Sequence, residues 1–119
     1  MGSGWDLSSS VEAVIAFREE RDWGQFHLPK ELAAGLAIEA AELQELFLWE
    51  PAERAEVTRN DSERLQSIRD ELADVATFVI MLAHDLEIDL AAAVDSKLIA
   101  NGRRYPADEY RGSSRKAPH

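Results

Sequence analysis

The sequence predicts an all-α fold, a short bundle of the four-helix type, in a chain of 119 residues. Apolar residues recur at helical spacing in four segments, and capping residues or prolines stand at several of their ends. The β-branched run at residues 77–80 resembles a strand, but helical spacing continues on both sides and no turn signal bounds it. A chain of this length is expected to form one domain with a real core.

The first helix is expected to begin at Ser9, which stands at capping-box spacing from Glu12, and to run to about residues 19–21. The second helix is expected to begin at Pro29, because a first helical turn accepts proline, and to stop at Pro51. Its apolar stripe is Leu32, Ala33, Leu36, Ala40, Leu43, Leu46 and Phe47. This is the clearest helix of the sequence.

Residues 51–61 are polar and predict a connection with at most a short helical turn. A third helix of about six turns follows over the apolar stripe from Leu65 to Leu82. Asp89 is a good N-cap for a fourth helix that reaches residues 101–102. The expected organisation is a flexible N-terminus at 1–8, a domain at 9–106 and an extended or disordered tail at 107–119.

Composition narrows the class of partner. The formal net charge of −10, from 23 acidic and 13 basic residues, disfavours a nucleic-acid polymer. A small phosphorylated ligand stays compatible with this charge, because a divalent cation bridges carboxylates and phosphates. The chain has no cysteine, so any metal must bind to oxygen or imidazole. We find neither an apolar run of about 18 residues nor a leader pattern, and we expect a soluble cytoplasmic protein with no membrane partner.

Two acidic pairs, Glu39 with Glu42 and Glu71 with Asp74, stand on consecutive long helices. Residues three apart share a helix face, and apolar or small residues flank both pairs, so the carboxylates are expected to face inward or into a cleft. Crowded carboxylates call for a compensating cation, and oxygen-only ligation favours Mg²⁺, with Mn²⁺ as a substitute. Either pair alone is more typical of a solvated acidic face. A di-iron bundle would need E-x-x-H, which the sequence lacks.

The sequence Glu39-Ala40-Ala41-Glu42 followed by Glu71-Leu72-Ala73-Asp74 resembles the motif of the MazG-like nucleotide pyrophosphohydrolases, members of the all-α NTP pyrophosphatase superfamily. The flanks, Arg-Asp-Trp-Gly-Gln-Phe-His at 21–27 and Glu-Leu-Phe-Leu-Trp at 45–49, are similar to the dCTP pyrophosphatase branch, as is the segment 96–106. The resemblance implies hydrolysis of a nucleoside triphosphate between the α and β phosphates. It also implies that the four acidic residues are metal ligands.

The resemblance assigns Trp23 and Trp49 to a base pocket, together with His27, although ordinary core packing also accounts for each of these residues. Glu42 or Glu45 would orient or deprotonate the attacking water. The remaining contacts, to phosphate, are assigned to Lys97, Asn101, Arg104 and Tyr105, which in an unrelated helix would simply cap the C-terminal end.

Two positions depart from the dCTP-preferring branch: Val14 stands where a histidine is expected and Phe78 where a tyrosine is expected. Each removes a hydrogen-bonding group from the expected pocket. The predicted activity is therefore Mg²⁺-dependent pyrophosphohydrolysis of dCTP or a modified dCTP in nucleotide pool cleansing. There are two alternatives: a non-catalytic helical oligomerisation module, and a relative directed to dUTP or phosphoribosyl-ATP. We expect a homo-oligomer, a tetramer, with sites near subunit interfaces.

Overall fold

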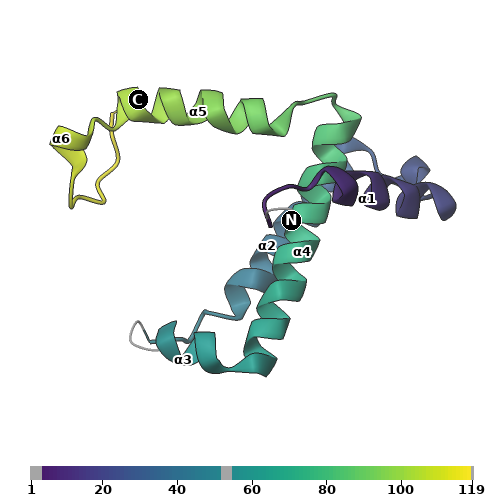
Figure 1. Ribbon diagram of the computed structural model, residues 1–119, viewed down its shortest axis with the longest axis horizontal. Coiled ribbons are helices and arrows are strands. Elements are labelled where there is room, and N and C mark those ends of the chain that lie inside the picture. Colours follow the sequence, from purple (N-terminus) through teal and green to yellow (C-terminus); the bar gives the residue numbers. More distant parts are fainter. Residues whose placement is uncertain (1–3, 52–54, 119) are drawn as a thin grey trace. The chain divides into compact units, whose positions relative to one another are not determined.

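A computed structural model describes residues 4–51 and 55–118 of the chain (Figure 1). In these residues all the regular secondary structure is helical, which confirms the predicted all-α class. The elements are α1 (Ser8–Glu20), the 3-10 turn η1 (Trp23–Phe26), α2 (Pro29–Glu45), α3 (Ala55–Asn60), α4 (Ser62–Asp85), α5 (Leu90–Arg104) and α6 (Ala107–Tyr110). Within the same residues, none of the helices is both long enough and apolar enough to cross a membrane.

The chain forms two compact units, the first ending at Leu86 and the second beginning at Glu87. In the first unit α2 and α4 lie side by side in the most extensive contact between elements, and α1 packs against α4 (Figure 1). Leu32 of α2 is fully buried, and Ile80 and Met81 of α4 are buried with it. Burial of these side chains holds the two long helices together.

Several helix ends follow the predicted capping residues. Pro29 stands in the first turn of α2, and the Asp89 carboxylate accepts a hydrogen bond from the backbone N–H of Ala92 at the start of α5. The predicted capping box at Ser9 was wrong, because α1 already begins at Ser8. The carboxylate of Asp6 accepts hydrogen bonds from the backbone N–H and the hydroxyl of Ser8 instead.

Two other helix limits differ from the predictions. Regular α2 ends at Glu45, and a run of turns, not helix, leads from there to Pro51. The connection after Pro51 contains α3, a six-residue helix, while residues 52–54 lie outside the described residues. The expected flexible N-terminus, of which residues 1–3 lie outside the described residues, stays a prediction, as does the single domain at 9–106.

The second unit consists of α5, α6 and the segment that follows them. We expected residues 107–119 to be extended or disordered, but α6 forms within them and Ala117 is buried. The Arg104 guanidinium donates a hydrogen bond to the Ala117 carbonyl at 3.1 Å, and the rings of Tyr105 and Tyr110 pack edge to face with centroids 5.0 Å apart. These contacts fold the C-terminal segment back on α5; residue 119 lies outside the described residues.

Candidate metal centre

Three of the four predicted metal ligands come together between α2 and α4. Carboxylate oxygens of Glu39, Glu42 and Glu71 lie within 4.8 Å of one another. The helices bring them together because Glu39 and Glu42 are neighbours on one face of α2, and α4 packs along that helix. Glu39 and Glu71 are half-buried, whereas Glu42 is exposed. The fourth predicted ligand, Asp74, is exposed one turn further along α4 and is not part of this three-residue cluster.

The electrostatics of the cluster fit a bound cation. The Oε2 atoms of Glu39 and Glu71 are both buried without a hydrogen-bond partner among the described residues. The adjacent Glu71 carboxyl, burial and the Glu42 carboxyl together raise the pKa of Glu39 to about 7. Unpartnered carboxylate oxygens crowded in this way are costly unless a positive charge lies between them. An all-oxygen donor set of this kind suits Mg²⁺ or Mn²⁺.

A cavity of about 480 Å³ opens beside Asp74, between α4 and the α1–η1 segment. Two predicted site residues, Trp23 and His27, line it with Asp74, and their rings meet edge to face with centroids 6.5 Å apart. The Nδ1 atom of His27 is buried and has no hydrogen-bond partner in the described part of the chain. The other lining residues are Ala13, Val14, Phe17, Arg18, Thr77, Phe78 and Met81. The cavity thus has apolar walls with few polar groups, as ligand sites commonly do.

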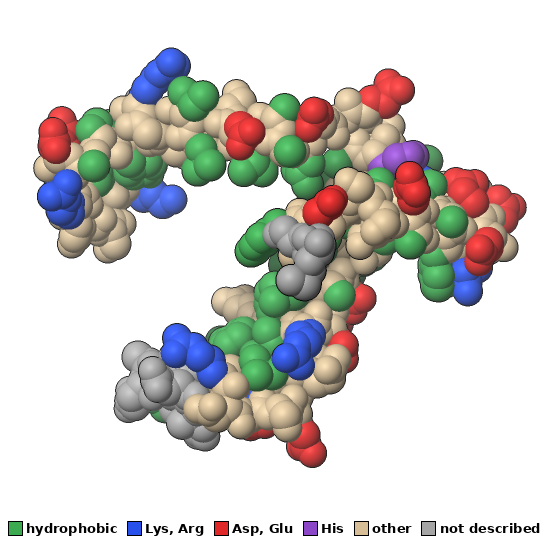
Figure 2. All heavy atoms as spheres, in the orientation of Figure 1, with side chains coloured by type: hydrophobic (Ala, Val, Ile, Leu, Met, Phe, Trp, Pro, Cys, Tyr) green, Lys and Arg blue, Asp and Glu red, His purple; other side chains and the backbone are tan. Residues whose placement is uncertain are grey.

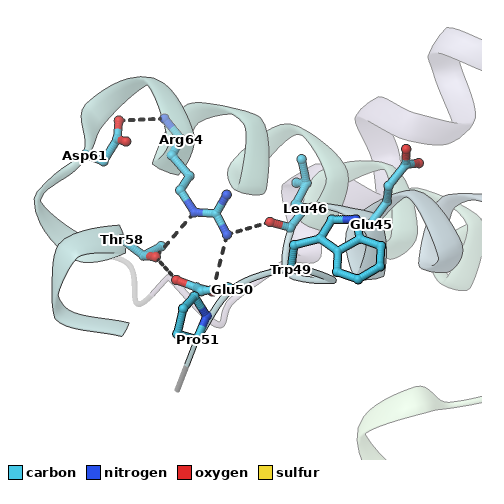
Figure 3. A pocket seen from close by; sticks show the side chains of 8 residues that line it. All are labelled: Glu45, Leu46, Trp49, Glu50, Pro51, Thr58, Asp61 and Arg64. Atoms are coloured by element: carbon cyan, nitrogen blue, oxygen red, sulfur yellow. Dashed lines mark hydrogen bonds and ion pairs between the residues drawn. The ribbon is translucent and has the colours of Figure 1, made fainter. Parts of the chain in front are cut away.

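Glu45 and Trp49 lie apart from Trp23, at a second cavity of about 380 Å³ at the end of α2 (Figure 3). Trp49 is 90% exposed. Arg64, in the first turn of α4, holds the segment of Glu45 and Trp49 in place through hydrogen bonds and an ion pair. Its guanidinium donates to the Leu46 carbonyl at 2.5 Å, contacts the Glu50 carboxylate at 3.3 Å and donates from Nε to Thr58, whose hydroxyl donates to Glu50 (Figure 3).

Replacing Arg64 with methionine is expected to lower the free energy of unfolding by about 2 kcal/mol, since hydrogen bonds from a charged group are lost. Urea unfolding measures this change. Arg69→Met, at an exposed position of the same helix, is the control and is expected to change it by less than about 0.5 kcal/mol. Equal losses in the two variants would show that Arg64 does not fasten the segment.

The predicted phosphate-contacting residues belong to the second unit. Lys97 and Asn101 line one shallow groove on α5. Arg104 and Tyr105 follow at the end of the helix, with the Arg104 guanidinium 5.3 Å from the centroid of the Tyr105 ring. Lys97 and Asn101 thus share one groove, and Arg104 and Tyr105 lie next to each other at the end of the helix.

Sequence reasoning missed a partly buried ion pair between α1 and α4. Arg18 is 6% exposed, and its two terminal nitrogens donate to the two carboxylate oxygens of Asp85 at 2.7 and 2.8 Å. One signal was present in the sequence: Arg18 lies on the same helix face as Val14 and Ile15, where another apolar residue would continue the stripe. Its partner, 67 residues away, left no comparable signal.

The pair makes stability depend on pH in a defined direction. The Arg18 guanidinium, with a smaller effect from His84, holds the pKa of Asp85 below its ordinary value of 3.8. The stabilisation is therefore present above about pH 4 and is lost as pH falls through the lowered pKa of the folded state. Asp85→Asn should cost about 1 to 2 kcal/mol at neutral pH, because two charge-assisted hydrogen bonds are weakened while the Asp85 side of the pair stays in contact with water. Urea unfolding should show a smaller difference between the variant and the unmodified protein at pH 3, and a difference independent of pH would contradict this assignment.

Comparisons with known proteins agree with the all-helical fold and with the family that the sequence resembles. Residues 35–118 match the model of the MazG-like family. The chain is 42% identical over 104 residues to dCTP pyrophosphatase 1 of Homo sapiens, covering 84% of this chain and 59% of that protein. It is 39% identical over 98 residues to dCTP pyrophosphatase 1 of Bos taurus, covering 82% of this chain and 58% of that protein. The chain thus spans somewhat under three fifths of the length of these curated relatives.

A solved structure is also similar over nearly its whole length. The crystal structure of a pyrophosphatase from Archaeoglobus fulgidus superposes with a TM-score of 0.76 at 32% sequence identity, covering 89% of this chain and 97% of that one. The matched family segment contains all four carboxylates, Glu39, Glu42, Glu71 and Asp74. The chain belongs to the MazG-like family.

Proposed function

We propose that this protein is an Mg²⁺-dependent nucleoside triphosphate pyrophosphohydrolase that produces a nucleoside monophosphate and pyrophosphate. The observation that carries the proposal is the carboxylate cluster, in which Glu39 and Glu71 each bury an oxygen that has no partner among the described residues. Membership of the MazG-like family and the similarity to proteins named as pyrophosphatases support the same reaction.

Glu39, Glu42 and Glu71 would hold the ion, with Asp74 completing the set from one turn further along α4. When bound, Mg²⁺ neutralises phosphate charge and lowers the pKa of a bound water. Glu42 and Glu45 are the two candidates for orienting that water. Of these Glu45 is favoured, because it lies one turn beyond Glu42 and outside the ligand cluster, so its lone pairs stay available to accept a proton.

The cavity beside Asp74 is proposed to take the nucleotide base. Its volume of about 480 Å³ is in the range of small-ligand sites, and the Trp23 ring offers a face or edge to a base. His27 Nδ1 is the unpartnered polar atom that a base edge would satisfy. The similarity to dCTP pyrophosphatases supports dCTP or a modified dCTP as the substrate. Trp49 lines the other cavity, so its proposed stacking on a base in the Trp23 cavity would need the Trp49 of a second subunit. A preference for dUTP or phosphoribosyl-ATP is the alternative, because Val14 and Phe78 stand where the dCTP-preferring branch has hydrogen-bonding side chains.

Phosphate binding is proposed for the second unit. Lys97 offers an ammonium and Asn101 an amide on the same groove of α5, and both groups donate hydrogen bonds to phosphate oxygens in many proteins. Arg104 and Tyr105 are proposed to extend this set at the end of the helix.

A homo-oligomer, and specifically a tetramer, is proposed as the assembly. None of the α5 residues is buried, and apolar side chains spread along it (Figure 2). An apolar helix face of this kind is expected to be covered by another subunit. The exposed apolar residues of this helix are Leu90, Val94, Leu98 and Ile99.

A panel of nucleoside triphosphates, incubated with Mg²⁺ or with EDTA, tests the proposal. Chromatography should detect a monophosphate product that needs Mg²⁺, formed with the highest kcat/KM from dCTP or a modified dCTP. A ranking led by dUTP or phosphoribosyl-ATP would support the alternative substrates. If no triphosphate is consumed with Mg²⁺ or Mn²⁺, the non-catalytic module becomes the better interpretation.

A further inference from the structure

One wall of the Trp23 cavity is held against α4 by the ion pair of Arg18 and Asp85. The wall consists of α1 and η1, and the opposite wall is α4 between Asp74 and Met81. Asp85, the last residue of α4, lies one turn beyond Met81. The two parallel hydrogen bonds of 2.7 and 2.8 Å fix both the distance and the orientation of the two side chains.

The Arg18 side chain also packs against η1. A Cβ atom added to Gly24 would lie 3.9 Å from Arg18 Nε, so the guanidinium lies directly against the 3-10 turn. Trp23 begins that turn and His27 follows it. Phe17, the neighbour of Arg18, packs edge to face on Trp23 with ring centroids 5.8 Å apart. Arg18 therefore lies against the turn that carries Trp23 and is the chain neighbour of Phe17, on which the Trp23 ring packs; the His27 ring in turn meets Trp23.

Stability alone does not account for a charged pair at this place. Arg18 is buried and its Nε has no hydrogen-bond partner among the described residues, which costs free energy. A pair of apolar side chains of similar volume often stabilises a buried position as well as an ion pair does. Apolar side chains, however, slide past one another, whereas a two-bond pair fixes one geometry.

We propose that Arg18 and Asp85 are positioning residues that set the width of the base cavity and thereby its selectivity among bases. This inference rests on the proposed function, in which the base enters this cavity. The pair acts through Trp23 and His27. Asp85 lies 14 residues beyond Glu71 on α4, about 21 Å along the helix, so the pair leaves the carboxylate cluster unaffected. Loss of the pair should therefore weaken binding and discrimination and leave the chemical step intact.

Steady-state kinetics of Asp85→Asn with the preferred triphosphate and the next best one test the proposal. We expect KM for the preferred substrate to rise about 10-fold, kcat to change by less than about twofold, and the kcat/KM ratio between the two substrates to fall. The charge-swapped double variant Arg18→Asp with Asp85→Arg should recover part of the lost selectivity. Glu20→Gln removes a charge from an exposed ion pair of α1, with N–O at 3.5 Å, and is the control that should leave all three values unchanged.

Tryptophan fluorescence tests the position of the cavity wall without any need for turnover. In a protein carrying Trp5→Phe and Trp49→Phe, Trp23 is the one remaining tryptophan, and its emission should shift to the red in Asp85→Asn as water enters the widened cavity. If Asp85→Asn does not fold, Arg18→Lys serves instead, because an ammonium cannot form the two parallel bonds. A folded variant with unchanged KM, selectivity and Trp23 emission would overturn the inference. Absence of turnover by the unmodified protein would overturn the proposed function alone, with Trp23 emission still deciding whether the pair sets the wall.

Discussion

Glu71→Gln is expected to lower Mg²⁺-dependent turnover by at least about 100-fold while the helical fold is retained. Glutamine keeps the shape of the side chain but removes a charge from the cluster of Glu39, Glu42 and Glu71. The Glu71 oxygen that has no partner in the described structure is the one a cation would use. Its loss should therefore abolish the metal site without disturbing the packing of α2 on α4.

Although Glu71→Gln is expected to lower turnover, it is not expected to lower the thermal stability of the metal-free protein. Without metal, Glu71 raises the pKa of Glu39 mainly because a hydrogen bond between the two carboxyl groups favours the protonated form, and their repulsion as anions adds to this. A glutamine amide donates to the Glu39 carboxylate instead, so the metal-free variant should melt at the same or a higher temperature than the unmodified protein. Mg²⁺ should stabilise the unmodified protein and not the variant. Glu63→Gln, exposed in the first turn of α4, is the control and should keep both turnover and the response to Mg²⁺.

Gly35→Ala is expected to destabilise the protein by about 1 to 3 kcal/mol, although alanine is the better helix former. A Cβ atom at this position would lie 2.5 Å from Cε1 and 2.6 Å from Cζ of the Phe78 ring, which is too close for any real contact. Either the ring leaves its place in the cavity wall or α2 moves away from α4. Glu39 lies one turn after Gly35, so a shift of α2 also separates Glu39 from Glu71 and turnover should fall.

Urea unfolding and kinetics of three variants separate these effects. Gly102→Ala, in α5 with no atom within 4 Å of the added Cβ, should leave stability unchanged or raise it by about 0.5 kcal/mol. The double variant Gly35→Ala with Phe78→Ala should be destabilised by less than the sum of the two single changes. Without the Phe78 ring, the methyl group at position 35 has no side chain to displace. Equal stability of Gly35→Ala and Gly102→Ala would show that helix packing at this point tolerates the methyl group.

Much of the fold could be predicted from local patterns. Helical spacing located α1, α2, α4 and α5, and Pro29 and Asp89 marked the starts of two of them. The acidic pairs were recognisable because their spacing of three residues places both members on one helix face. The clustering of Glu39, Glu42 and Glu71 then follows from the packing of α2 on α4.

The features that could not be predicted depend on contacts between distant parts of the chain. The Arg18–Asp85 pair joins residues 67 apart, and neither side chain signals its partner in the sequence. No local pattern marks Gly35 as a packing position, because the ring that leaves no room for a Cβ atom there belongs to Phe78 on another helix. Asp74 follows Glu71 by one turn of α4, but it lines the cavity beside Trp23 and is not in the cluster of three. That turn carries Asp74 away from Glu42, toward the point where Phe78 meets Gly35.

The bond that is cleaved tests the account most directly. Phosphorus NMR of the unmodified protein with its preferred triphosphate and Mg²⁺ should reveal a nucleoside monophosphate and pyrophosphate in equal amounts. Neither product should accumulate with the Glu71→Gln variant. Release of orthophosphate together with a nucleoside diphosphate, or the same products at the same rate from Glu71→Gln, would contradict cleavage between the α and β phosphates at the carboxylate cluster.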